Sequence, residues 1–122
     1  MSAGEDPHAA YLAACEPEAR ARLLAVRAEW ERRIPGTSRC IAYQMPALRA
    51  GGPKGRVIAY FASFRHHLGI YPPVKGPPGL LAELAPYAGP KGNLAFPHKD
   101  PLPLDLIGRV GEALAAQYGR PR

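Results

Sequence analysis

Two histidines stand side by side in the stretch FASFRHHLGIYPP, residues 61–73. Imidazole titrates near neutral pH, so His66 and His67 are candidates for proton transfer, metal binding or contact with an anion. In an extended strand His67, Gly69 and Tyr71 share one face, and the apolar residues between them share the other. The stretch therefore fits two structures: a shallow polar pocket, or a hairpin in which Gly69 makes room for aromatic packing.

A second candidate is the glycine-rich stretch YAGPKGNLAFPHKDPLP, residues 87–103. Lys91 and Gly92 fall in a predicted turn, where backbone N–H groups and the lysine ammonium could bind a phosphate or a carboxylate. The alternative is a solvated lysine on a loop that leads into an edge strand. If both stretches serve one ligand, we expect His67 and Lys91 to line a common anion pocket.

Few other groups suggest chemistry. The sequence does not identify metal ligands. Neighbouring histidines of a strand point to opposite faces, and the remaining donors are dispersed along the sequence: His8, His98, Cys15, Cys40 and isolated acids. HExxH, P-loop, GxGxxG and G-x-S-x-G motifs are all absent from the sequence. We therefore predict a non-enzymatic protein without a cofactor, and keep as an alternative an enzyme with His67 as acid or base and Lys91 as anion clamp.

The composition is that of one globular domain spanning residues 1–122. The chain has 47% hydrophobic and 21% charged residues, and no apolar run approaches the roughly 20 residues that cross a bilayer. The first residues, MSAGEDPHAA, carry acids where a signal peptide carries bases. We expect a cytoplasmic protein without membrane contact, with Cys15 and Cys40 as free thiols.

The sequence is basic, with 16 Lys and Arg against 10 Asp and Glu and a net charge of +6. Such a charge favours contact with anions, including nucleic acid. The bases are scattered along the sequence rather than gathered on one element. Any nucleic-acid association is therefore expected to be weak, indifferent to sequence and sensitive to salt.

The elements that must position these residues follow from periodicity and from turn signals. Helices are predicted over 7–14, 16–36, 76–89 and 100–119, and strands over 38–45, 56–64, 67–72 and 93–96, with residues 49–56 as a hairpin loop. Leu23, Val26, Trp30 and Ile34 form one helix face, which places Trp30 between the long helix and the sheet. Gly108 and Gly111 weaken the last helix, which suggests close packing against a neighbour. This order predicts an α+β fold with an antiparallel sheet covered by helices on one face.

Four ordered motifs resemble a known family. YQMPAL, YFASFRHHLGIYP, YAGPKGNLAFP and PLPLDLIGRV resemble, in order and spacing, the YdhG-like domain, a bacterial family of unknown function. The resemblance runs from about residue 9 to about residue 117. It implies a sandwich like that of frataxin, with helices over an antiparallel sheet. Some members of the family are described as frataxin-like intracellular iron chaperones.

The family pattern falls on identifiable positions of this sequence: Tyr43, Met45, Pro46, Phe61, His67, Gly69, Tyr71, Lys91, Gly92, Phe96 and Pro97. His66 falls on a variable turn position, and Asn93 stands where a small hydroxyl residue is common. The long helix mixes acids with arginines, so the sequence supplies no cluster of carboxylates for iron.

These observations predict a binding domain rather than an enzyme. Its expected partner is a small anionic ligand or a protein, and no oligomeric state is predicted. The first alternative is an iron chaperone and the second is weak nucleic-acid association. The candidate ligand-binding residues are Tyr43, Met45, His67, Tyr71, Lys91 and Gly92.

Overall fold

The computed structural model describes residues 6–119; the first five residues and the basic tail 120–122 lie outside the described part. Five strands form one antiparallel sheet in the order of the sequence: β1 (Thr37–Ala42), β2 (Met45–Ala50), β3 (Arg56–Ser63), β4 (His67–Tyr71) and β5 (Leu94–Pro97). The helices are α1 (Ala9–Ala14), α2 (Pro17–Arg33), α3 (Pro78–Leu84) and α4 (Leu104–Tyr118), with a 3-10 turn η1 (Ala85–Tyr87). The predicted α+β class is confirmed.

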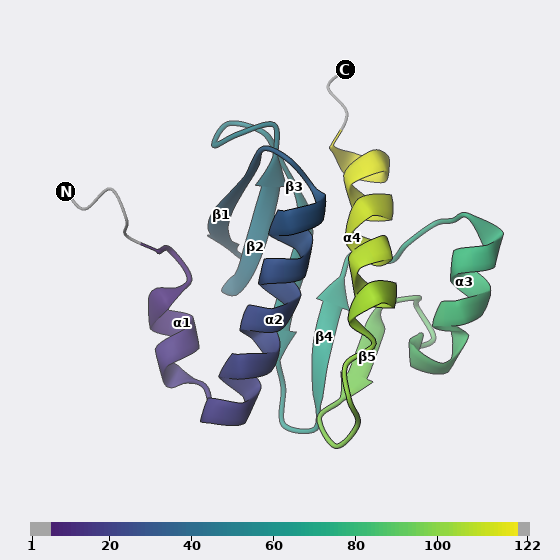
Figure 1. The fold of residues 1–122 in the computed structure, drawn as a ribbon, viewed down its shortest axis with the longest axis horizontal. Coiled ribbons are helices and arrows are strands. Elements are labelled where there is room, and N and C mark those ends of the chain that lie inside the picture. The colour runs from purple at the N-terminus through teal and green to yellow at the C-terminus, as the bar shows by residue number, and fades with distance from the viewer. Residues whose placement is uncertain (1–5, 120–122) are drawn as a thin grey trace.

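Helices α2 and α4 lie side by side across one face of the sheet (Figure 1). The predicted inner face of α2 is fully buried at Leu23, Val26 and Trp30. Trp30 lies under α4, where its indole N–H donates to the carbonyl of Ile107 at 2.7 Å. Its ring meets Phe61 of β3 edge to face, with the ring centres 5.4 Å apart. The predicted place of Trp30 between the long helix and the sheet is therefore confirmed.

The two glycines of α4 explain how closely this helix approaches α2. A Cβ atom on Gly111 would lie 2.3 Å from Cδ1 of Trp30, and one on Gly108 would lie 2.3 Å from Nε of Arg33. At Gly111 only a residue without a side chain fits beside the indole ring, and at Gly108 a Cβ would displace the Arg33 side chain. The helix accepts two weak helix formers because they let Trp30 and Arg33 lie against its backbone.

The prediction of one strand over 38–45 is wrong. β1 ends at Ala42 and β2 begins at Met45, and the prediction that residues 49–56 are all loop fails because β2 continues to Ala50. Tyr43 and Gln44 make the turn between them with φ values of 52° and 64°. These two residues lack the Asn-Gly signal that usually marks such a hairpin, and Pro46 argued against a strand.

The second face of the sheet is free of α2 and α4 (Figure 1). Since Phe61 points to the helices, its neighbours Tyr60 and Ala62 point to this open face. The register places Cys40, Ala47, Tyr60 and Tyr71 in one row across four strands. We call this side the open face of the sheet.

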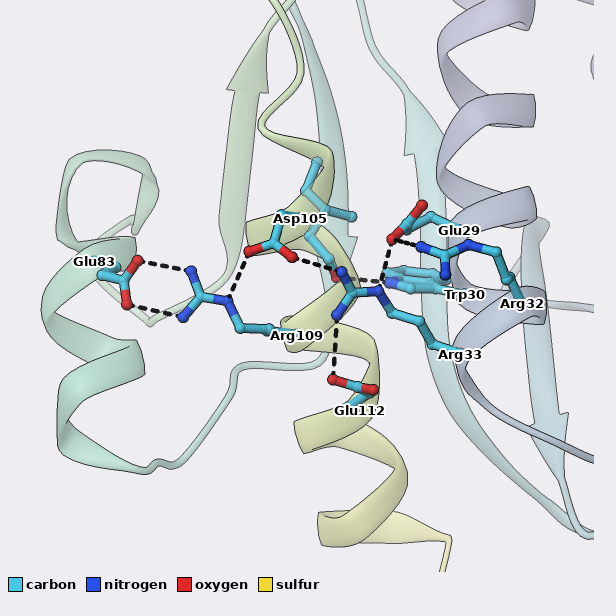
Figure 2. A network of polar contacts seen from close by, with 9 residues as sticks. Glu29, Trp30, Arg32, Arg33, Glu83, Asp105, Arg109 and Glu112 are labelled. Carbon is cyan, nitrogen blue, oxygen red and sulfur yellow. Dashed lines mark hydrogen bonds and ion pairs between the residues drawn. The ribbon is translucent and has the colours of Figure 1, made fainter.

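A network of ion pairs joins the helices on the covered side (Figure 2). Arg33 of α2 contacts Glu29, Asp105 and Glu112, and Arg109 of α4 links Asp105 to Glu83 of α3. The hydrogen bond from Arg33 lowers the pKa of Asp105, and the hydrogen bond from Arg109 lowers the pKa of Glu83. These carboxylates therefore form ion pairs that link the helices.

Candidate functional site

One end of the sheet gathers several of the predicted site residues. The turn between β3 and β4, residues 64–66, lies beside the chain that leaves β5, because His67 pairs with Pro97 and the His98 N–H donates to the His66 carbonyl at 2.9 Å. The turn between β1 and β2 lies at this same end, since Ala47 pairs with Tyr60 in the antiparallel register. His67 therefore stands where two chain segments meet.

A groove of about 550 Å³ opens between these two segments. Its lining consists of Arg65, His66, His67, Pro97, His98 and Lys99. Every ionisable residue in this lining is a base. We call it the basic groove; it adjoins a larger, mixed-charge hollow of about 750 Å³ that shares Arg65 and His98 and includes Glu16, Glu18 and Arg22.

Hydrogen bonds to the backbone hold the walls of the basic groove in place. The His98 ring contacts the Phe64 carbonyl through Nε2 at 2.9 Å, and since a carbonyl only accepts, Nε2 carries the proton. Arg22 of α2 donates to the carbonyls of Pro97 and Asp100, each at 2.9 Å. The turn and the loop are thus fixed to each other and to α2.

His67 is partly buried between aromatic and basic neighbours. Its ring stacks on Phe64, with 5.1 Å between ring centres and 26° between planes. Burial lowers the pKa of His67, and the neighbouring imidazoles of His98 and His66 lower it further. A bound anion would oppose these charges and raise the pKa, so anion affinity and protonation of His67 are linked.

The structure also shows what Gly69 accommodates. A Cβ atom at this position would lie 2.9 Å from the Tyr71 hydroxyl and 3.0 Å from Phe64 Cε2. The Tyr71 ring meets Phe64 edge on, at 6.5 Å. His67, Gly69 and Tyr71 share a face, as predicted, and in this structure aromatic packing occupies the space over the glycine.

Lys91 and Gly92 lie toward the other end of the β4–β5 pair. Ile70 pairs with Leu94, and a Cβ on Gly92 would lie 3.1 Å from Pro73, which follows β4. His67 is three residues from Ile70, roughly 10 Å along the strand, and Lys91 lies three residues beyond Leu94. Lys91 lines neither the basic groove nor the adjoining hollow. A ligand role for Lys91 is a separate prediction.

Tyr43 and Met45 flank the turn between β1 and β2. Tyr43 is 82% exposed, and its ring contacts Tyr60 at 5.7 Å on the open face. Met45 is half-buried at the start of β2. Neither residue lines the basic groove. The contact with Tyr60 places Tyr43 on the open face, and the alternation along β2 gives Met45 the same side as Ala47.

Within residues 6–119 no group of three or more histidine, cysteine and acid side chains could hold a metal ion. Cys15 and Cys40 are free thiols, as expected. Nor does any helix in this range combine the length and apolar character that a membrane span requires.

Sequence reasoning missed three members of the basic groove: Arg65, His98 and Lys99. His98 and Lys99 follow a predicted strand directly, and Arg65 precedes the histidine pair. Antiparallel pairing of the two segments would have brought them together, but the pairing of 67–72 with 93–96 could not be read from either stretch alone.

No protein-family model matches the sequence, and no curated protein does. A solved structure does match the fold: a Bacillus subtilis protein of the DUF1801 family, YdhG, with a TM-score of 0.72 and 19% sequence identity over 91% of this chain and 90% of that one. The five-stranded antiparallel sheet and the four helices correspond to that fold. The resemblance inferred from the four motifs is confirmed at the level of structure: the chain has the YdhG-like α+β fold.

Proposed function

We propose that the chain binds a small anion, one that presents a phosphate, sulfate or carboxylate group, in the basic groove. The observation that carries the proposal is the composition of the lining: two permanent cations, Arg65 and Lys99, and the imidazoles of His66, His67 and His98, with no acid. Charge-assisted hydrogen bonds from such donors are about twice as strong as neutral ones.

The anchored backbone supports the same proposal. Because His98 is held by the Phe64 carbonyl and the His66 carbonyl, its ring and the backbone of both walls are positioned before a ligand arrives. A preorganised site loses less conformational entropy on binding than a flexible one. The groove is also large enough for a small organic acid or phosphate ester.

Sulfate titration followed by NMR tests the proposal, because sulfate keeps its charge between pH 5.5 and 8. We expect saturable shifts at residues 65–67 and 98–99, with tighter binding at pH 5.5, since His67 gains its proton only at lower pH. Lys99→Gln and Arg65→Gln should each weaken binding about tenfold, the size of one lost charge-assisted hydrogen bond.

The matched control is Lys54→Gln, which removes an exposed lysine from the loop between β2 and β3, outside the groove. It should leave sulfate affinity nearly unchanged; an equal loss from both lysine variants, or shifts spread over the whole surface, would show general attraction to a basic protein. An anaerobic Fe(II) titration of the same sample tests the iron-chaperone alternative. Saturable iron binding that displaces sulfate would favour that alternative.

A further inference from the structure

The open face of the sheet carries five aromatic side chains from neighbouring strands and turns. Tyr43 contacts Tyr60, Tyr60 pairs directly across the sheet with Tyr71, and Tyr71 and His67 both contact Phe64. We call these five residues the aromatic band. It crosses the sheet from the β1–β2 turn to β4, and Tyr43 and Phe64 are 82% and 41% exposed.

Small residues lie in the sheet between these rings. Tyr60 is flanked across the strands by Ala47, and Ala62 pairs with Gly69, so no bulky aliphatic side chain separates the rings. Covering a glycine is one structural use for an aromatic side chain. That use accounts for Tyr71 and Phe64 over Gly69 but leaves Tyr43, which projects from a turn, unexplained.

The charges of the molecule are divided between the two layers. From residue 32 to residue 82 the sequence has no Asp or Glu, and none of the five strands contains one. Three acids of the helical layer, Glu29, Asp105 and Glu83, pair with arginines of that layer, and Glu31 pairs with Arg39 of β1. The sheet layer therefore keeps an excess of positive charge that the sequence order did not reveal.

Two arginines place that charge beside the aromatic band. Arg49 shares the open face with Tyr60 and donates to the Gly55 carbonyl. Burial raises the pKa of Tyr60, and the nearby Arg49 charge acts in the opposite direction. Arg65 lies in the turn next to Phe64 and lines the basic groove. Within residues 6–119 neither arginine forms an ion pair with an acid.

From this geometry we propose that the open face binds single-stranded nucleic acid, with bases stacked on the aromatic band and phosphates at Arg49 and Arg65. Open sheet faces with exposed rings and flanking cations bind single strands in this way. Acidic side chains would satisfy the arginines but carry no ring that could stack on the aromatic band. A duplex keeps its bases stacked internally, so its affinity would rest on charge alone.

Fluorescence anisotropy with labelled oligodeoxythymidylate of about 15 nucleotides tests the proposal. We expect the wild-type chain to bind this strand at least about tenfold more tightly than a duplex of equal length. Tyr43→Ser and Phe64→Ser should each weaken binding at least about fivefold, the lower limit for one stacked base. The matched control is Leu81→Ser on α3, because Leu81 is nearly as exposed as Phe64, at 39% against 41%, but lies off the sheet.

Two variants that lose the same charge at different places test whether the position of the charge matters. Arg65→Gln and Arg32→Gln change the net charge equally, but Arg32 belongs to the helical layer, where it pairs with Glu29. Only Arg65→Gln should weaken oligonucleotide binding by more than about threefold. Circular dichroism of each variant checks that the fold persists.

Three results would overturn the proposal: equal affinity for single strand and duplex, equal effects of Phe64→Ser and Leu81→Ser, or displacement of the oligonucleotide by polyglutamate of the same charge. The proposal goes beyond the anion groove and can be distinguished from it. Tyr43→Ser should weaken the oligonucleotide complex and leave sulfate binding unchanged, while Lys99→Gln should do the reverse.

Discussion

Replacing Trp30 with alanine should lower the free energy of unfolding by about 3 to 5 kcal/mol, the usual cost of removing a large aromatic side chain from a core. The ring is fully buried between α2, α4 and β3, and its N–H bonds to the Ile107 carbonyl. Urea denaturation followed by far-ultraviolet circular dichroism measures the change, because the variant loses the only tryptophan of the chain. A loss below about 1 kcal/mol would show that the ring contributes little to the core.

Gly111→Ala supplies the matched test of the same contact. Its Cβ would lie 2.3 Å from the Trp30 ring, so in the wild-type background we expect a loss of about 1 to 3 kcal/mol from overpacking. In the Trp30→Ala background the obstacle is gone, and the same change should stabilise α4 by up to about 1 kcal/mol through helix propensity. Equal effects in both backgrounds would contradict the close approach of the two helices.

The helical layer was the part of the fold that the sequence predicted best. Leu23, Val26, Trp30 and Ile34 recur at helical spacing, and Pro17 fits the first turn of α2, where its missing N–H costs nothing. The β1–β2 hairpin was missed, because Tyr43 and Gln44 adopt positive φ without the residues that usually do so. A local turn signal was absent, and only the pairing of the strands reveals the turn.

The candidate site was predicted less completely than the fold. His67, Gly69 and Tyr71 share a face because strands alternate, which a sequence shows directly. The nearness of His67 to His98 and Lys99 depends on the register between β4 and β5, which 22 intervening residues do not encode locally. The same register places Lys91 away from the basic groove.

Charge shows a similar limit. The sequence has arginines in helices, strands and loops alike, and the net charge of +6 does not tell which face of the protein is positive. Folding pairs Glu29, Glu83 and Asp105 with arginines of the helical layer and Glu31 with Arg39 of β1. Since the strands contain no acid, a positive excess stays on the sheet. The gap of acids between residues 32 and 82 is visible in the sequence, and its meaning depends on knowing that these residues build the sheet.

His8 is a buried polar residue that sequence reasoning treated only as a distant metal ligand. Its Nε2 lies 3.0 Å from the Cys40 carbonyl and 3.1 Å from the Ala47 carbonyl, so Nε2 carries the proton. Its Nδ1 lies 3.1 Å from Arg27, which also pairs with Asp6. The neutral imidazole thus joins the start of the chain to α2 and to two strands.

Replacing His8 with leucine should cost at least about 2 kcal/mol, because two buried carbonyls and Arg27 lose a partner and each unsatisfied group costs about 1 to 3 kcal/mol. Urea denaturation at pH 7.5 measures the loss. His66→Leu is the matched control, since this histidine is exposed in the β3–β4 turn, and it should leave stability nearly unchanged. Equal stability of the two variants would contradict a structural role for His8.

The pH dependence of stability provides a second measure of the same buried imidazole. Burial lowers the pKa of His8 from 6.5, and the nearby Arg27 charge lowers it further, against the effects of Asp6 and the two carbonyls. The unfolded chain therefore takes up the proton first as pH falls below about 6.5, and the wild-type protein should lose stability by up to about 1.4 kcal/mol per pH unit until the pKa of the folded state is reached.

His67, whose pKa is also lowered, adds to this slope, so His67→Gln serves as the comparison. The lowered carboxyl pKa values of Glu29, Glu83 and Asp105 act in a separate window, below about pH 4.5. Between pH 7.5 and 5 the slope should be smallest in the His8→Leu variant, and an unchanged slope there would mean that the buried imidazole titrates as freely as in the unfolded chain.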